Sequence, residues 1–208
     1  MAENPLFDTV GAGLSFLDTV LHARVNPQGV VEKTLTRLLY VGTLTGPAQA
    51  VFDLHTSFGF SADTTGLLVA QSSSFLGLVE SPSEDAVALV RHLEHASAEG
   101  NAGVASLRVV ACVEDCPSRY FGPFSCRSVT TPAEAPPNLD EGTIGVATDM
   151  MAAVTGVGQQ LLELSSHTGD FAAALEQLQD PRFASQLPSD ERVKVVAASD
   201  QVSFKQRT

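Results

Sequence analysis

Two histidines spaced three residues apart, His92 and His95, are of a type and spacing that could bind a metal. On a helix, residues three apart share one face, so both imidazoles could reach the same ion. The surrounding sequence, Arg-His-Leu-Glu-His, lacks the His-Glu-x-x-His arrangement of metalloproteases. We therefore predict that both histidines lie on the solvated side of a helix and that no metal is bound.

The three cysteines, Cys112, Cys116 and Cys126, are the other potential metal ligands. Cys112 and Cys116 have three residues between them and no histidine nearby in sequence. Structural zinc sites usually start from tighter cysteine pairs and need four ligands. In a reducing compartment three cysteines do not form a disulfide framework. We expect Cys112 to be a strand residue and Cys126 a small core residue.

Nucleophilic or phosphate-binding chemistry has only weak candidates. Ser72, Ser73 and Ser74 are consecutive hydroxyls, but they occupy a predicted hairpin turn without a nearby base in sequence. The glycine pairs of 11–13 and 156–158 lack the Gly-Lys-Ser/Thr element of a phosphate-binding loop. No catalytic constellation emerges, so the sequence predicts a protein that is not an enzyme and that has no catalytic residues.

The charge balance restricts the partners. Twelve Lys and Arg stand against 24 Asp and Glu, for a formal charge of −12. Nucleic acids and anionic membranes are bound mainly through basic residues, so neither is expected as a partner. The acidic surface of tubulin is likewise expected to make little direct contact, which leaves basic or apolar protein surfaces. No apolar run and no basic leader suggests a membrane span or secretion, so we expect an intracellular protein.

The elements that would position these residues alternate between strand and helix patterns. Strands are predicted at 35–42, 66–70, 75–80, 106–113 and 124–129, and helices at 47–60 and from residue 83 onwards. The apolar face of the second helix is expected to comprise Val87, Leu89, Val90 and Leu93. The order βαββαββ predicts an α+β fold with a mixed or antiparallel sheet and two helices on one face.

Apolar stripes continue outside these strands and helices. Residues 4–22 carry leucine, valine and phenylalanine at helical spacing, and 142–166 and 170–178 are also predicted to be helical. The remaining residues, 180–208, are expected to form short helical pieces and a tail. We divide the chain into 1–30, an N-terminal amphipathic helix and turn; 33–131, the sheet domain; and 132–208, a linker with a C-terminal helical extension. Some apolar side chains should cover the sheet, and the rest are expected at partner interfaces.

Four stretches of the sheet region match a known family when taken in order. They are Thr36-Arg37-Leu38-Leu39-Tyr40, Thr65-Gly66-Leu67-Leu68 continuing through Phe75-Leu76 to Val79-Glu80, Leu107-Arg108-Val109, and Arg119-Tyr120-Phe121-Gly122-Pro123-Phe124-Ser125-Cys126. In these stretches the chain resembles the BLUF domains of flavin photoreceptors. The resemblance implies a ferredoxin-like βαββαββ domain, here with an N-terminal helix and a C-terminal helical extension.

The positions that hold flavin in that family differ in this chain. The resemblance implies a tyrosine, an asparagine and a glutamine around the flavin, with a tryptophan and a methionine near them. Tyr40 matches the tyrosine, but the asparagine falls near Gly59 and the glutamine at Gly77, while Phe124 and Cys126 occupy the last two positions. Since an unpaired polar edge of a buried flavin costs about 1–3 kcal/mol per group, we predict a degenerate pocket without a cofactor.

A second resemblance is to testis-expressed and flagellar BLUF-like proteins. Thr65-Gly66-Leu67-Leu68 and the pair Glu80-Ser81 match their Thr-Gly-Leu-Leu…Glu-Ser signature. It implies a non-enzymatic structural subunit of the ciliary or flagellar axoneme, in the central apparatus or a spoke-type complex. The implied location is the cytoplasm and cytoskeleton, with other axonemal accessory proteins as partners. A flavin-binding light sensor with a rearranged pocket and another small-ligand sensory domain stay open as alternatives.

Overall fold

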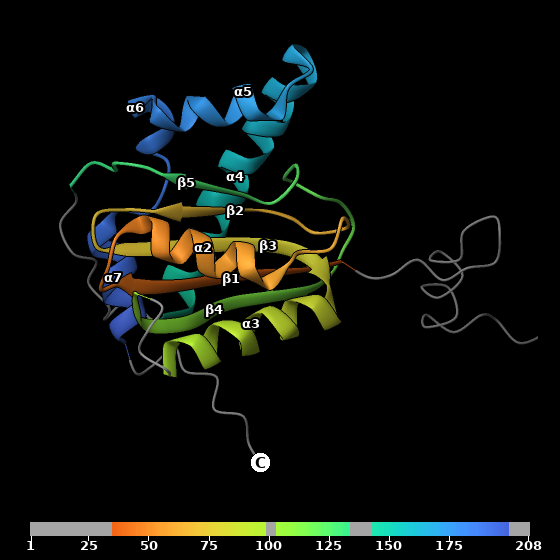
Figure 1. Ribbon diagram of the computed structural model, residues 1–208. Helices are drawn as coiled ribbons and strands as arrows, with labels where there is room; N and C mark the ends of the chain where they lie inside the picture. Colours follow the sequence, from red (N-terminus) through yellow and green to blue (C-terminus); the bar gives the residue numbers. More distant parts are fainter. Residues whose placement is uncertain (1–34, 99–102, 134–142, 200–208) are drawn as a thin grey trace, which may run out of the picture. The chain divides into compact units, whose positions relative to one another are not determined.

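The computed structural model describes residues 35–98, 103–133 and 143–199 (Figure 1). These ranges belong to one compact unit spanning residues 34–208. The N-terminal helix predicted at 4–22 and the tail after residue 199 lie outside the described residues.

The strands and helices follow the predicted order. The strands are β1 (Leu35–Leu44), β2 (Thr65–Ala70), β3 (Ser74–Pro82), β4 (Val104–Cys116) and β5 (Ser125–Ser128). The helices are α2 (Ala48–Phe58), α3 (Ser83–Ala98), α4 (Thr143–Thr168), α5 (Phe171–Glu176), the 3-10 turn η3 (Gln177–Gln179), α6 (Pro181–Ala184) and α7 (Asp190–Ala198). The predicted α+β class and βαββαββ order are thus confirmed.

The five strands form one mixed sheet in the order β4-β1-β3-β2-β5. All neighbouring pairs are antiparallel except β2 and β5, which run parallel. In the central β1–β3 pair, Tyr40 lies opposite Gly77 and Arg37 lies opposite Glu80. These two pairings position the two polar clusters described below.

Helices α2 and α3 cover one face of the sheet (Figure 1). Side chains alternate between the two faces of a strand, so Leu38 and Tyr40 point to this face together with Val51, Leu89 and Phe75. The predicted apolar face of α3 is partly wrong. Leu89 and Leu93 are buried, but Val87 is 49% exposed and Ala86 takes the inward position instead.

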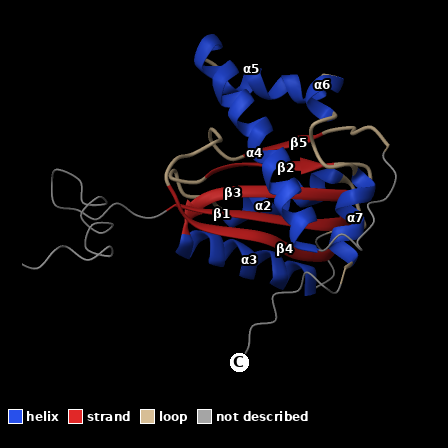
Figure 2. Ribbon diagram, turned by 180° about the vertical axis from the view of Figure 1, so that it is seen from behind, coloured by secondary structure: helices blue, strands red, loops and turns tan. Residues whose placement is uncertain are grey.

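The C-terminal helices cover the other face, where Figure 2 shows α4 and α7 in front of the sheet. The cluster on this face contains side chains from β1, β2 and β3 and from the helices. From the helices it includes Met150, Val154, Val157, Leu161, Leu175, Leu178, Val193 and Val196, and Leu187 joins it from the segment between α6 and α7. These residues are among the apolar side chains of the C-terminal extension, some of which we expect to cover the sheet, and they do so because the face opposite α2 and α3 needs cover within the chain.

A polar contact fastens α7 to the β2–β3 turn. The Asp190 carboxylate, at the start of α7, accepts hydrogen bonds from the hydroxyls of Ser72, Ser73 and Ser74 at 2.7, 2.7 and 2.6 Å. Burial alone would raise the pKa of Asp190, but the hydrogen bonds from these serines lower it to about 2. A carboxylate this weakly basic positions the serines and does not activate them.

Replacing Asp190 with alanine is expected to lower the free energy of unfolding by about 2–3 kcal/mol, since several hydrogen bonds to a charged acceptor are lost together. The matched change Glu191→Ala, at an exposed neighbouring position, should shift it by no more than about 0.5 kcal/mol. Urea denaturation monitored by circular dichroism measures both. Equal effects of the two substitutions would show that this contact does not hold α7.

Candidate functional site

The centre of the candidate site is a hydrogen bond between two buried aromatic side chains, Tyr40 on β1 and His55 on α2. Tyr40 is 1% exposed and His55 is fully buried. The Tyr40 Oη and His55 Nε2 atoms are 2.8 Å apart, and His55 Nδ1 is 2.7 Å from the carbonyl oxygen of Val51. Because a carbonyl can only accept, Nδ1 carries the proton; Nε2 of the neutral ring then accepts from the tyrosine hydroxyl.

Aromatic rings continue outward from this pair. The His55 ring is stacked on Tyr40 with centroids 5.7 Å apart, and on Phe124 with centroids 6.1 Å apart. The ring centroids of Phe60 and Phe124 are 4.1 Å apart, and those of Phe58 and Phe60 are 5.2 Å apart. These five side chains, the aromatic stack, fill the space between α2, the chain leading to β2, and β5.

Gly77 is required by the position of the Tyr40 ring. A Cβ atom added at Gly77 would lie 2.6 Å from Cε2 of Tyr40 and closer still to Cζ and Oη. The ring therefore lies over the glycine at the position where the resembled photoreceptors have their glutamine. A side chain at position 77 would not fit beside the inward Tyr40 ring.

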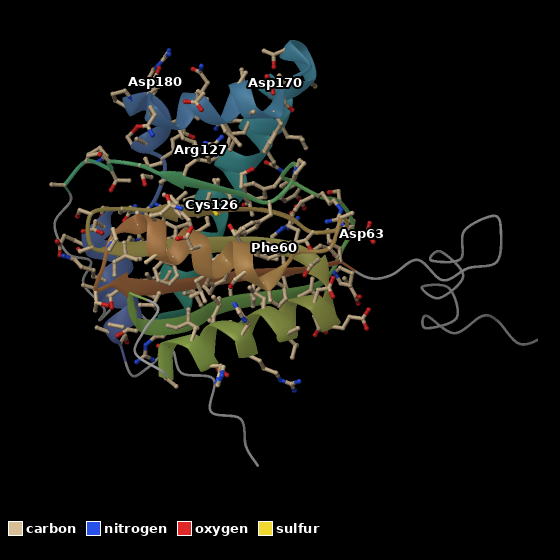
Figure 3. The ribbon with its side chains drawn as sticks, in the orientation of Figure 1. Phe60, Asp63, Cys126, Arg127, Asp170 and Asp180 are labelled. Carbon is tan, nitrogen blue, oxygen red and sulfur yellow. The ribbon has the colours of Figure 1, made fainter. Side chains whose placement is uncertain are left out.

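The structure brings four of the five predicted pocket positions to one face. Tyr40 and Gly77 are directly opposite in the sheet, and Phe124 and Cys126 pack against the same cluster as Tyr40. Cys126, labelled in Figure 3, lies on β5. Gly59 is separate: it ends α2 with a φ of 69°, a left-handed conformation that favours glycine, and a Cβ there would touch nothing.

Sequence reasoning missed His55, the polar residue that takes the buried position on α2. The signal was present, because Val51 and His55 are four residues apart and therefore share the buried face of a helix. The apolar pattern predicted for that helix, Ala50, Val51, Leu54 and Phe58, omits the histidine between them.

The protonation states at the site are those of a neutral cluster. Burial lowers the pKa of His55 to about 4; the hydrogen bond to Val51 opposes this and the nearby His92 adds to it. Burial raises the pKa of Tyr40 well above its ordinary value, with a smaller contribution from Cys126. Burial also raises the pKa of Cys126 to about 11, against the effect of Arg127. None of these groups offers a charge to a ligand at neutral pH.

A flavin does not fit these residues. Its polar edge needs donors and acceptors at fixed positions, yet the Tyr40 hydroxyl is already bonded to His55, and Gly77 has no side chain. The stacked rings of His55 and Phe124 and the tilted ring of Phe60 occupy the adjacent space. Among the described residues, open cavities lie elsewhere, for example beside β4 and beside the β2–β3 turn.

The structure shows where the two histidines weighed as metal ligands lie. His95 is exposed, as expected. His92 is half-buried, contrary to expectation, because its Nε2 lies 3.2 Å from the Leu54 carbonyl oxygen and its ring packs on Phe58. Within the described ranges, no three His, Cys, Asp or Glu side chains are grouped as metal ligands.

A second polar cluster surrounds the fully buried Glu80. Its carboxylate is paired with Arg37 at 2.8 Å and accepts from the Thr65 hydroxyl at 2.8 Å. It also accepts backbone N–H bonds from Tyr120 and Phe121 at 3.0 and 3.2 Å. Glu80 thereby fastens the loop before β5 to β2 and β3, and all its acceptor capacity is used within the chain.

Replacing Gly77 with alanine is expected to cost about 1–3 kcal/mol of unfolding free energy, because the new methyl group overlaps the Tyr40 ring. In a Tyr40→Leu background, which removes the ring, the same change should cost less than about 0.5 kcal/mol. Gly156→Ala on α4 is the matched control, since a Cβ there meets open space. Urea denaturation of the four variants measures the coupling, and an unchanged cost in the Tyr40→Leu background would contradict it.

Comparisons with known proteins address the family and the fold. No curated protein matches the chain in sequence. Among solved structures, the dark-state BLUF protein BlrB is 16% identical, with a TM-score of 0.38 over 70% of this chain and 95% of that one. The BLUF chain of BlrP1 is 17% identical with a TM-score of 0.37, over 48% of this chain and 66% of that one.

A longer BlrP1 chain from Klebsiella pneumoniae, in a complex with calcium and cy-diGMP, is 16% identical with a TM-score of 0.36. That match covers 46% of this chain and 24% of the longer one, so the chain spans less than two thirds of either BlrP1 chain. No ligand or activity transfers from those proteins at such similarity. Within the described ranges, no helix has the length and apolar content to cross a membrane. The model of the family described as testis-expressed protein 47 matches residues 34–204, and the chain belongs to that family.

Proposed function

We propose that this protein is a non-enzymatic structural subunit of the ciliary or flagellar axoneme that uses its BLUF-like fold as a protein-binding scaffold. The observation that supports this most is the closed site around Tyr40. Its hydroxyl is hydrogen-bonded to His55, and the His55 ring is stacked on Phe124, so side chains of the chain itself occupy this space. Because side chains fill the interior position, we infer that the protein acts through its surface, by binding other proteins.

The absence of enzymatic activity is part of the proposal. His55 is neutral and enclosed, Glu80 is fully hydrogen-bonded within the chain, and the low pKa of Asp190 makes it a poor base. General acid–base catalysis needs a group that titrates near the working pH and can reach a substrate. His55 and Asp190 have pKa values far from neutral, and the fully buried Glu80 carboxylate cannot reach a substrate.

The proposed partners are other accessory proteins of the axoneme, in the central apparatus or a spoke-type complex. The charge of −12 favours basic or apolar protein surfaces and disfavours direct contact with acidic tubulin, nucleic acid or anionic membrane. Membership of a testis-expressed family is consistent with a place in the sperm flagellum.

Fractionation of flagellated cells that carry the tagged full chain tests this proposal. We expect the protein to stay with demembranated axonemes after detergent extraction and to leave them in high salt, since salt screens the acidic contacts. Chemical cross-linking of intact axonemes should join it mainly to accessory proteins. Complete release as a monomer by detergent alone would overturn the proposal.

Absorption spectroscopy tests the alternative of a flavin sensor. Purified protein is expected to be colourless in the flavin region, before and after incubation with flavin mononucleotide. A bound chromophore would contradict the closed site and favour the sensory function.

A further inference from the structure

Strand β4 forms one edge of the sheet, and among the described residues its paired strand is β1 (Figure 1). A cavity of about 540 Å³ lies along this edge. Its floor is the β4 segment Ala105–Val109, one wall is the end of α3, and the other is the end of α7. We call this cavity the β4 groove; its walls include Glu94, Ser97 and Ala98 of α3 and Ala197 and Ala198 of α7.

The backbone of β4 presents hydrogen-bonding groups to the groove. The Ser106 N–H donates to Oγ1 of Thr43 on β1, so the backbone polar groups of Ser106 point towards β1. Successive residues of a strand direct their N–H and C=O groups to opposite edges. The backbone N–H and C=O groups of Ala105 and Leu107 therefore point away from β1. In agreement, the Ala105 carbonyl accepts a hydrogen bond from Ser97 Oγ at 3.4 Å. An outward edge of this kind is a template for another strand.

Strand β4 pairs regularly with β1 only over short stretches. The pairing of β4 with β1 shifts register in three places, and an uninterrupted stretch runs from Leu107 to Val109. A second one covers Ala111 to Val113. Register shifts of this type discourage continuous pairing of two long edges, such as those of two copies of the chain. They leave room for a short extended segment.

The side chains around the groove indicate the chemistry of that segment. Exposed Glu94 lines it, and Glu114 and Asp115 are exposed further along β4. Val113 beside them is 45% exposed. The Arg108 side chain also lines the groove, where its Nε donates to the Ala197 carbonyl at 2.6 Å. Three carboxylates against this one guanidinium leave the edge with net negative charge, and Val113 adds apolar surface.

We propose that the β4 groove binds an extended, basic and apolar segment of a partner protein as an added strand, hydrogen-bonded to Ala105, Leu107 and Val109. The inference rests on the proposed scaffold function, because the segment would come from a neighbouring protein in the assembly. Backbone bonds supply affinity in this binding mode, and alternating side chains supply selectivity.

A synthetic peptide, acetyl-Lys-Val-Lys-Val-Lys-Val-Lys-amide, is the probe, and the full-length protein is titrated with it in solution. We expect saturable binding, with amide chemical shifts changing at Leu107 and Val109 and slower hydrogen exchange there. Ala105→Pro, which removes an outward N–H, should weaken binding by about tenfold. Ala105→Val keeps that N–H and should bind as the wild type does. Thermal unfolding establishes that both variants are folded.

Other outcomes overturn the proposal. Equal binding of the acidic peptide with Glu in place of Lys would contradict the charge argument. Amide chemical-shift changes confined to other surfaces would show that the peptide does not bind in the β4 groove. A chain ending at Ser199 that binds the peptide much more tightly would assign the groove to the protein's own C-terminal residues. A concentration-dependent dimer that Ala105→Pro abolishes would assign it to a second copy. Binding in solution is measured independently of axonemal location, so its failure is distinguishable from failure of the proposed function.

Discussion

Replacing Glu80 with alanine is expected to lower the free energy of unfolding by about 3–5 kcal/mol, the largest effect of any single change considered. The carboxylate is fully buried and is the counter-ion of Arg37, whose side chain is 9% exposed. Without it, the guanidinium would remain buried beside the Tyr120 ring, which its Cζ approaches to 4.0 Å, without a compensating charge. Urea denaturation at neutral pH with linear extrapolation measures the loss.

The Glu80 prediction also has a local consequence. The N–H groups of Tyr120 and Phe121 lose their acceptor, so the loop before β5 should become sensitive to proteolysis near Arg119 in the alanine variant. Glu163→Ala on the exposed face of α4 is the control and should change the unfolding free energy by less than about 0.5 kcal/mol. Adding Arg37→Met to Glu80→Ala should recover part of the loss, because the unpaired charge is removed. A cost for Glu80→Ala as small as that of the control would mean that the ion pair does not stabilise the fold.

The strand and helix order could be predicted because the apolar pattern of each segment is local. The apolar runs 66–70 and 75–80 flank a serine turn and form the β2–β3 hairpin as predicted. The Pro47 start and Gly59 end of α2 agree with its apolar spacing. Strand neighbours depend on contacts between distant segments. The pairing of β1 with both β3 and β4, which brings Arg37 to Glu80, has no local signature.

The sequence identified the residue types at the predicted pocket positions but not what packs between them. The inward Tyr40 ring over Gly77 depends on a close approach between strands that no spacing reveals. His55 could have been found from its spacing to Val51, since a buried histidine implies a buried partner. Asp190 could not, because 116 residues separate it from Ser74.

The Tyr40–His55 pair predicts that the protein loses about 3 kcal/mol of stability as the pH falls from neutral to about 4. An unfolded chain binds a proton on His55 near its ordinary pKa of about 6.5, whereas burial keeps the folded-state pKa at about 4. Between these values the unfolded state holds more protons, so acidification favours unfolding. The stability contributed by the neutral His55 is fully present above pH 6.5 and disappears as the pH falls to 4. Urea denaturation at half-unit pH steps measures this slope.

The double variant Tyr40→Phe/His55→Leu isolates the contribution of this pair, because it removes the titrating ring and leaves no unpaired hydroxyl. Its stability should be nearly flat between pH 6.5 and 4, apart from the carboxylates that begin to titrate at the lower limit. His167→Gln, which changes an exposed histidine, should keep the wild-type slope. Asp190 does not confuse the result, since its folded-state pKa of about 2 places most of its contribution below this window. Equal slopes for the double variant and the wild type would mean that His55 is accessible to protons in the folded protein, and the closed site would have to be reconsidered.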